Sequence, residues 1–419
     1  MIRKSSFAPP GFRPVPRTGV IFVMTEAVKR GFTAGSTEWS NLGQGAPETG
    51  PIDGAPARIN SISITNDEHE YAPVDGLPQL REAVAEMYNE RYRKNKTSKY
   101  TKENVAICAG GRLALTRLVA TLGRTNMGHF LPDYTAYEEL LDAFGTFVPI
   151  PILLNPDKGY SFTAEDLKEE ILGRGLSAVL LSNPCNPTGK AMHGKELENW
   201  VSVSRSLGCT LILDEFYSHY IFEGENSSVS AASFVEDVDE DPIVIVDGLT
   251  KNWRYPGWRV CWTLAPKQII EGIASAGSFL DGGCARPMQI AALPLVNAAT
   301  AEQESGAIRR HFGAKRSYML ERLSAMGIKV DPVPGGSFYC WGDLSELPES
   351  IGTGMKLFRQ ALDENVIIVP GEFFDINPGQ RRPERPGRYR HYARFSFGPP
   401  AAELERGLEK LEKVISKAK

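Results

Sequence analysis

The chain has 419 residues, of which 42% are hydrophobic and 23% are charged, and its formal net charge at pH 7 is −4. A chain of this length favours one large domain with a smaller satellite. The near-neutral charge excludes a strongly basic nucleic-acid-binding protein, and no apolar run is long enough to cross a membrane, so we expect a soluble protein.

The six cysteines stand singly, and no two of them form a Cys-x-x-Cys pair. Isolated cysteines in apolar runs or beside glycines are typical of reduced, buried thiols rather than of a disulfide framework or a zinc site. We therefore expect a cytoplasmic protein without a metal centre. The six histidines are equally dispersed, and His219 is the one that lies near candidate chemistry.

The N-terminal segment, residues 1–17, mixes basic residues with prolines and lacks the apolar core of a secretion signal. It predicts an extended arm that lies over a partner subunit. Apolar residues at helical spacing then predict a helix over residues 20–30. Residues 39–47 predict a short strand that enters a glycine turn, where Gly45 lets the backbone approach a ligand closely. Tyr71 lies in a loop that precedes an amphipathic helix.

A buried strand at residues 105–108 is followed by Gly110-Gly111-Arg112 and then by a helix over residues 113–122. Backbone N–H groups at a helix N-terminus, freed by glycines, form a cradle for phosphate. Tyr134 follows the next strand and places an aromatic ring at a second strand end.

Two more buried strands end in polar residues. The strand at residues 179–182 leads into two Asn-Pro steps, which hold the chain extended so that Asn186 can point its amide at a ligand. The strand at residues 210–213 ends in Asp214, with Tyr217 three residues later. A carboxylate at the end of a buried parallel strand is costly unless a cation meets it.

The apolar strand at residues 243–246 is followed by Lys251, and Arg259 stands eight residues later beyond a Pro-Gly turn. A parallel strand delivers Lys251 to the carboxyl edge of a sheet, where open α/β folds bind their ligands. Burial would lower the pKa of Lys251 and make it a usable amine nucleophile, and Arg259 could hold a phosphate with two hydrogen bonds.

The alternation of strand, polar residue and helix between residues 100 and 265 predicts a mainly parallel α/β sheet covered on both faces. A long helix over residues 298–326 is expected to connect this sheet to a smaller α+β domain. That domain is expected to contain strands at residues 333–341 and 366–369, a final helix, and a loop at residues 375–390. The loop is rich in arginine: Arg381, Arg382, Arg385, Arg388 and Arg390.

Taken together, these motifs resemble those of the class I/II, fold-type I aminotransferases, which depend on pyridoxal 5′-phosphate. The resemblance spans Gly45 to Arg394, and the motifs occur in the family's order. They are Asn-Pro-x-Asn-Pro-Thr-Gly at 183–189, Asp-x-x-Tyr at 214–217, Lys-x7-Arg at 251–259 and Arg-Phe-Ser at 394–396.

The resemblance implies a three-layer large domain built on a mainly parallel sheet, with a smaller α+β domain built from the N- and C-terminal segments. We expect the arm and part of the small domain at residues 1–50. The large cofactor-binding domain is expected at residues 51–297, and the connecting helix and small C-terminal domain at residues 298–419.

By the same resemblance, Lys251 bonds covalently to the cofactor, is displaced by the substrate amine and then shuttles a proton. Asp214 is expected to pair with the pyridine nitrogen of the cofactor. Asn186 and Tyr217 would hydrogen-bond the phenolic oxygen, and Tyr134 would stack on the ring. Lys251, Asp214 and Tyr217 are thus the expected catalytic residues.

The cofactor phosphate is expected to be bound by Arg259, Gly111, Arg112 and Thr250. Tyr71 would reach the phosphate of the neighbouring subunit in a homodimer, and Arg286 could approach the partner's site. Arg394 would hold the substrate α-carboxylate bidentately, with Gly45 and Asn186 also in the substrate site.

The chain departs from the family pattern in ways that leave the substrate open. Gly248 stands where many relatives have a serine, the usual acidic residue after Gly45 is missing, and Trp253 and Arg254 are bulky. The loop at residues 375–390 is longer than usual.

The favoured function is transamination between an L-amino acid and a 2-oxo acid by a ping-pong cycle. The alternative is a pyridoxal-phosphate-dependent lyase, replacement enzyme or C–C bond-forming enzyme that acts on S-adenosylmethionine or a similar γ-activated amino acid. The chain also resembles the aminocyclopropane-carboxylate synthases, and the arginine-rich loop could then meet an anionic cosubstrate. A non-catalytic regulator is disfavoured, because the short N-terminal arm cannot encode a helix-turn-helix domain.

Overall fold

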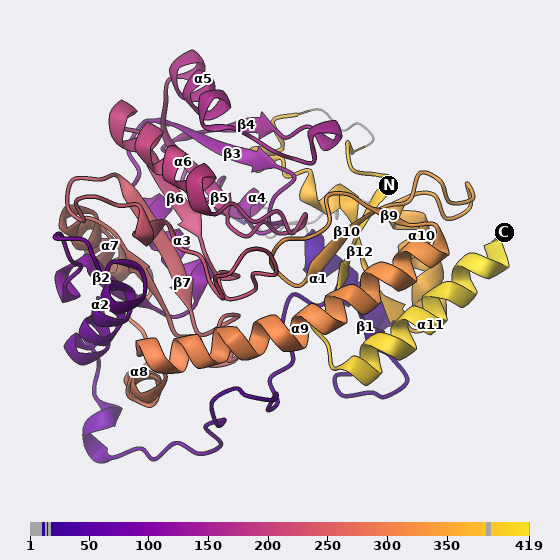
Figure 1. Cartoon of the computed structure of the whole chain (residues 1–419), viewed down its shortest axis with the longest axis horizontal. Coiled ribbons are helices and arrows are strands. Elements are labelled where there is room, and N and C mark those ends of the chain that lie inside the picture. The colour runs from indigo at the N-terminus through magenta and orange to yellow at the C-terminus, as the bar shows by residue number, and fades with distance from the viewer. Residues whose placement is uncertain (1–10, 13–14, 16–17, 383–386, 419) are drawn as a thin grey trace.

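The computed structural model describes residues 11–12, 15, 18–382 and 387–418 (Figure 1). The greater part of the arm predicted at residues 1–17 therefore lies outside the described residues, as does Arg385. The first described helix is α1 (Gly19–Lys29), and both of its ends lie one residue earlier than those of the helix predicted over residues 20–30.

The largest sheet in the described part of the chain has seven strands in the order β2-β8-β7-β6-β5-β3-β4. β8 runs antiparallel to both of its neighbours, and the other pairs are parallel, so the prediction of a mainly parallel sheet is confirmed. The strands are β2 (Val105–Cys108), β3 (Asn126–Leu131), β4 (Val148–Leu153), β5 (Leu176–Ser182), β6 (Thr210–Asp214), β7 (Ile243–Gly248) and β8 (Cys261–Leu264).

Both faces of this sheet are buried, which explains why its strands are continuous apolar runs rather than alternating ones. In β6, Leu211 and Leu213 pack in one core and Ile212 packs in the other, because successive side chains point to opposite faces. One face is covered by α2 (Pro78–Tyr92), α5 (Ala164–Arg174) and α6 (Gly194–Leu207), and the other by α3 (Gly111–Thr121) and α7 (Lys267–Leu280).

The connecting helix α9 (Ala298–Met326) has the bounds predicted from the sequence, and Figure 1 shows it running from the large sheet to the smaller one. Both of its ends are fixed by local signals. The Asn297 side chain accepts a hydrogen bond from the Thr300 N–H at 2.9 Å, and Gly327 ends the helix in the left-handed conformation with a φ of 87°.

The smaller sheet has the order β12-β13-β10-β9, and a separate parallel pair joins β1 to β11. Its elements are β9 (Lys329–Val330), β10 (Tyr339–Asp343), β12 (Val369–Pro370) and β13 (Tyr392–Ser396), and the pair consists of β1 (Ser40–Asn41) and β11 (Val366–Ile367). Because β1 pairs with β11, N- and C-terminal segments form one unit, as the predicted fold class requires. The exact boundaries at residues 50 and 297 stay a prediction.

Two predicted strands of this unit differ from the structure. The strand predicted at 366–369 is divided into β11 and β12, which pair with β1 and β13 respectively. The strand predicted from residue 333 begins only at Tyr339. The glycines before it bond to other loops instead, since Gly336 N–H donates to Gly189 O at 2.9 Å and Gly335 O accepts from Phe222 N–H at 2.9 Å.

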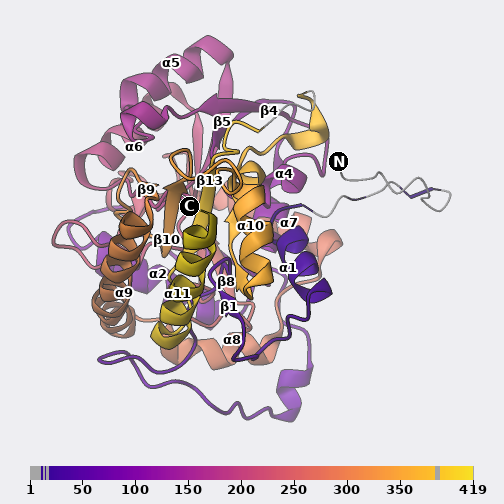
Figure 2. The same ribbon diagram turned by 90° about the vertical axis from the view of Figure 1, so that its right-hand side faces the viewer.

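Figure 2 shows α9, α11 and α10 side by side at the smaller sheet. The remaining helices are α4 (Tyr137–Leu140), α8 (Arg286–Ala292), α10 (Gly354–Asp363) and α11 (Ala401–Ala418). The 3₁₀ turns are η1 (Asn66–His69), η2 (Lys102–Asn104), η3 (Pro156–Lys158), η4 (Ala231–Ser233), η5 (Leu293–Leu295), η6 (Gly371–Phe374) and η7 (Pro378–Gln380).

All six cysteines are free thiols, five buried and one half-buried, which confirms the prediction of reduced, unpaired cysteines. Within the described residues, no group of three or more His, Cys, Asp and Glu side chains is arranged to hold a metal ion. No helix of that part of the chain combines the length and the apolar character needed to cross a membrane. The cytoplasmic location stays a prediction.

Candidate active site

The carboxyl ends of β5, β6 and β7 lie side by side and open into a cavity of about 390 Å³. This cavity brings together the site residues predicted from the sequence, except Tyr71 and Arg286, which were expected to serve the partner's site. The predicted residues that line it are Gly45, Gly111, Arg112, Tyr134, Asn186, Asp214, Tyr217, Thr250, Lys251, Arg259 and Arg394.

Lys251 lies in the turn that follows β7, and its ammonium donates a hydrogen bond to the backbone carbonyl of Gly45. Burial and, to a lesser extent, the nearby guanidinium groups of Arg112, Arg259 and Arg394 lower the pKa of Lys251 to about 7, while Asp214 opposes them. An amine with this pKa is largely neutral just above pH 7, as a nucleophile or a general base requires.

Asp214 is the last residue of β6 and lies buried at the floor of the cavity. Its carboxylate accepts hydrogen bonds from the Tyr137 hydroxyl at 2.8 Å and from the Phe216 N–H at 3.3 Å. Burial raises the pKa of Asp214 to about 6, against the lowering effect of these bonds and of Lys251. The group is thus a buried acid that is ionised at neutral pH and suits a cationic partner such as a protonated ring nitrogen.

The N-terminus of α3 forms one wall of the cavity. Gly110 precedes this helix with a φ of 94°, and a Cβ at this position would lie 1.8 Å from Nη2 of Arg259. The absence of a side chain therefore lets Arg259 approach the free N–H groups of the helix. Among the described residues, the buried hydroxyl of Thr250 has no hydrogen-bond partner. A helix N-terminus, a guanidinium and a free hydroxyl together fit a phosphate group.

Arg394 lies in β13, and its side chain is only 1% exposed. Nη1 donates to Asn186 Oδ1 and Nη2 donates to Gly43 O, both at 2.8 Å, and the guanidinium lies 4.1 Å from the centre of the Tyr339 ring. Nε is buried and has no partner within the described residues. This fixed guanidinium at the cavity wall suits a substrate carboxylate.

Two tyrosines that were expected around the cofactor ring are both held by hydrogen bonds. The Tyr217 and Tyr339 hydroxyls lie 2.8 Å apart, and burial raises the pKa of Tyr217 well above its ordinary value, so this phenol stays protonated. The Tyr134 hydroxyl accepts a hydrogen bond from Arg112 Nη2 at 3.0 Å.

The sequence reasoning assigned no role to Tyr137 and Tyr339, which hold Asp214 and Tyr217 in place. Tyr137 stands three residues after Tyr134, at the start of α4, and this short spacing is the one local signal that could have drawn attention to it. Tyr339 carries no such signal, because β10 meets the cavity only through the tertiary fold.

Tyr71 does not line this cavity in its own chain. Its side chain is 90% exposed, and its backbone carbonyl accepts a hydrogen bond from Arg286 Nη1 at 3.4 Å. The expectation that Tyr71 serves the neighbouring subunit is compatible with this exposure, and it stays a prediction.

An aspartate within the arginine-rich loop partly neutralises the positive charge of that loop. Arg382 and Arg388 both form ion pairs with Asp375, at 2.8 Å and 3.1 Å. The Asn377 N–H donates to Glu138 Oε2 at 3.0 Å, so the start of the loop packs on α4. The expected role of the loop toward an anionic cosubstrate stays untested.

Comparison with known proteins gives a consistent result. The family model described as aminotransferase class I and II matches residues 37–411. A probable aspartate/prephenate aminotransferase of Aquifex aeolicus is 27% identical over 356 residues, which cover 84% of this chain and 85% of that protein. An aspartate/prephenate aminotransferase of Thermus thermophilus is 26% identical over 363 residues, covering 85% of this chain and 86% of the relative.

Solved structures show the same fold. An aspartate aminotransferase from Thermus thermophilus with maleate superposes with a TM-score of 0.76 at 22% identity, covering 96% of this chain and 100% of the other. An aminotransferase from Mycobacterium tuberculosis gives a TM-score of 0.77 at 23% identity, covering 96% and 97% of the two chains.

Proposed function

This chain belongs to the aminotransferase class I and II family, and we propose that it holds pyridoxal 5′-phosphate on Lys251 and transfers an amino group between an L-amino acid and a 2-oxo acid. The observation that carries the proposal is the position of Lys251, a half-buried residue whose amine has a pKa of about 7 and lies among three arginines and one acid. When bound, the cofactor supplies an electron-withdrawing ring that accepts the electron pair left as the substrate Cα loses its proton.

Three features of the cavity fit this cofactor. The missing side chain of Gly110 brings Arg259 close to the N–H groups at the start of α3, where a phosphate would bind. The hydroxyl of Thr250, which has no partner among the described residues, would add a further donor. Asp214 would hold a positive charge on the ring nitrogen. Tyr134 offers its ring for stacking, and Tyr217 and Asn186 offer polar groups at the cavity wall.

The substrate would be bound by Arg394 through its carboxylate, with Asn186 and Gly45 beside it. The neutral Nζ of Lys251 would accept the proton from Cα, and the buried walls of the cavity would limit competition from water. Because the named relatives are aspartate aminotransferases, aspartate is the first amino donor to test.

The lyase alternative is not favoured, because the named relatives are aminotransferases. A half-reaction separates the two activities. With an amino donor alone, an aminotransferase leaves its cofactor in the aminated form and its absorbance stays changed. A lyase returns to the starting spectrum, and that result would support the alternative.

We also propose a homodimer in which Tyr71 reaches the phosphate of the partner's cofactor. The support is the resemblance of the motifs and the exposure of Tyr71, which does not line the active-site cavity of its own chain.

Replacing Lys251 by Ala tests the proposed function. We expect Lys251→Ala to lose the visible absorbance of the cofactor-bound enzyme and to lose turnover by at least about 10³-fold, because both the covalent attachment and the general base are removed. Absorbance after mixing with pyridoxal 5′-phosphate and an aspartate half-reaction are the measurements. Turnover that survives this change would show that the lysine assignment is wrong.

A further inference from the structure

A chain of buried hydrogen bonds lies behind the catalytic lysine, outside the active-site cavity. It runs from Arg91 on α2 through His219 to Asn252, the residue after Lys251. We propose that Asn252 and His219 are positioning residues that hold Lys251 in register with Asp214 and Tyr217. The proposal rests on the proposed role of Lys251.

Asn252 is fully buried and ties the loop after β7 to the loop after β6. Its Nδ2 lies 2.7 Å from Asp247 Oδ1, and it lies 2.9 Å from Ser218 Oγ and 3.0 Å from Glu215 O. Its Oδ1 accepts from the His219 N–H at 3.0 Å. One amide side chain thus joins the end of β7 to the segment that follows Asp214.

The imidazole of His219 adds a second link between the same two loops. Nδ1 lies 2.9 Å from the backbone carbonyl of Asn252, and Nε2 lies 2.9 Å from Nη1 of Arg91. A carbonyl only accepts and a guanidinium only donates, so Nδ1 carries the proton and Nε2 accepts. Burial, followed by the charge of Arg91, lowers the pKa of His219 well below its ordinary value, which agrees with this single neutral tautomer.

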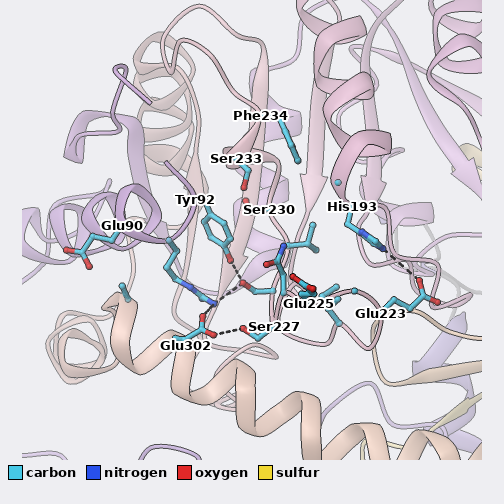
Figure 3. A pocket seen from close by; sticks show the side chains of 18 of the residues that line it. Glu90, Tyr92, His193, Glu223, Glu225, Ser227, Ser230, Ser233, Phe234 and Glu302 are labelled. Atoms are coloured by element: carbon cyan, nitrogen blue, oxygen red, sulfur yellow. Dashed lines mark hydrogen bonds and ion pairs between the residues drawn. The ribbon is translucent and has the colours of Figure 1, made fainter. Parts of the chain in front are cut away.

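Arg91 fixes the outer end of the chain of bonds. Its Nη2 donates to Ser228 Oγ at 2.8 Å and to Glu302 Oε2 and Ser305 Oγ at 3.3 Å, and its side chain is 6% exposed. Glu302 and Ser305 belong to the connecting helix α9. Figure 3 shows this end of the network, with Glu302 facing Ser227.

These bonds act on the backbone that carries Nζ. The carbonyl of Lys251 accepts from the Tyr220 hydroxyl at 3.1 Å, and the carbonyl of the next residue accepts from His219. Two successive peptide groups of the lysine loop are therefore bound to the loop that carries Tyr217. A displacement of about 1 Å at a reacting group can cost about 10²-fold in rate, so loosening these bonds is expected to affect the chemical step more than substrate binding.

His219→Phe tests the proposal, because it keeps an aromatic ring beside Trp253, whose centroid lies 4.7 Å away, and removes both ring nitrogens. We expect kcat to fall by about ten- to a hundredfold while KM changes by less than about threefold. We also expect a shift in the pH at which the absorbance of the cofactor-bound enzyme titrates, and a changed rate of amine modification at Lys251 of the cofactor-free chain, followed by mass spectrometry.

His219→Gln supplies one donor and one acceptor and is expected to keep kcat within about threefold of the wild type. The matched control is His193→Phe. Arg91 and Glu302 line a surface pocket, and His193 lies at the far side of this pocket, next to Glu223 (Figure 3). His193 is outside the chain of hydrogen bonds, so its replacement is expected to change neither kcat nor the absorbance.

Two results would overturn the proposal. The first is a His219→Phe enzyme with a lower Tm but unchanged kcat, absorbance and lysine reactivity. The second is an equal loss of kcat in the His219→Phe and His219→Gln variants, because the loss would then come from the changed shape of the side chain and not from the lost hydrogen bonds.

If His219→Phe does not fold, Arg91→Gln replaces it as the test. The same loss of kcat is expected, and an unchanged kcat would contradict the proposal. A wild-type chain without cofactor absorbance would instead refute the proposed function itself.

Discussion

Two ionisable residues of the candidate active site, the half-buried Lys251 and the buried Asp214, have pKa values shifted toward neutrality from opposite sides. Burial disfavours the charged form of each, so the pKa of the lysine falls to about 7 and that of the acid rises to about 6. Between about pH 7 and pH 8 the carboxyl group of Asp214 is therefore mostly ionised, and the amine of Lys251 becomes increasingly neutral. These are the charge states that a cofactor with a protonated ring nitrogen and an electrophilic aldehyde requires.

The lowered pKa of Lys251 predicts a pH dependence of cofactor capture. The protonated amine is not a nucleophile, so the rate of covalent binding to the cofactor-free enzyme should rise about tenfold per pH unit below pH 7 and level off above it. Stopped-flow absorbance after mixing with pyridoxal 5′-phosphate measures this rate, and Lys251→Ala is the control. A rate that continues to rise up to pH 10.5, the ordinary pKa of a lysine, would contradict the argument that burial lowers the pKa of Lys251.

Arg394 presents a planar guanidinium that a lysine cannot replace. Arg394→Lys is expected to lower kcat/KM for amino-acid substrates by about 30- to 100-fold, because one point charge replaces a two-pronged hydrogen bond worth about 2–3 kcal/mol. Cofactor affinity should stay within about threefold of the wild type. Steady-state kinetics and cofactor titration measure the two effects, and Arg381→Lys, on an exposed loop, is the control. An equal loss of kcat/KM and of cofactor affinity would count against a carboxylate-binding role of Arg394.

At the scale of single elements, the start of α3 depends on a glycine. The φ of Gly110 is 94°, which L side chains rarely adopt, and its missing Cβ leaves the space that Arg259 occupies. The glycine therefore allows both the turn into the helix and the approach of the guanidinium to the helix N-terminus.

Gly110→Ala is accordingly expected to weaken cofactor binding by at least about tenfold, because the strained positive-φ conformation alone costs about 1–3 kcal/mol and Arg259 must move. Gly123→Ala, two residues beyond the same helix, is the matched control, since a Cβ there meets nothing within 4 Å. Absorbance titration of the cofactor-free enzyme compares the two variants. Unchanged affinity in Gly110→Ala would argue against a phosphate at this helix end.

The contact between β7 and β8 accounts for one departure from the family pattern. A Cβ on Gly248 would lie 2.5 Å from Cα of Cys261 on the paired strand. A serine at this position would therefore require the two strands to separate. The hydroxyl of Thr250, two residues later, has no partner among the described residues, and under the proposed function it would supply the donor that the missing serine would have given.

At the scale of the whole molecule, the lysine loop is connected to the helix that links the two sheets. Arg254 follows Lys251 by three residues, and its guanidinium forms a fully buried ion pair with Glu304 of α9 at 2.7 Å. The same guanidinium donates to Gly50 O at 2.6 Å. The bulky arginine that departs from the family pattern thus joins the active-site loop to α9 and to the segment after Gly45.

The proposed homodimer predicts complementation between two defective chains. Lys251→Ala abolishes the site that contains it, whereas Tyr71→Ala impairs the site of the partner. Mixing the two variants after denaturation and refolding should restore activity, because one of the two sites in a mixed dimer is then intact. A chain that carries both changes, refolded with wild type, is the control. Absence of recovery, with mixed dimers verified by mass spectrometry, would exclude a contribution of Tyr71 to the partner's site.

The sequence by itself located the buried strands that lead into the cavity, the connecting helix, and most of the residues that line the cavity. A polar residue directly after a continuous apolar run, such as Asp214 at the end of β6, identifies the carboxyl edge of a sheet, because the apolar run itself indicates a strand buried on both faces. The bounds of α9 follow from Asn297 and Gly327, whose capping bonds lie within the neighbouring turn.

The tertiary structure alone decided which side chains face these residues. Tyr137 meets Asp214 across 77 positions of the chain, and Tyr339 meets Tyr217 across 122. The bond of Asn252 to Glu215, in the loop after β6, spans 37 positions. Periodicity reports which face of an element is buried, whereas the opposing partner depends on the packing of elements that are remote in the chain, and a single sequence carries no local signal for that choice.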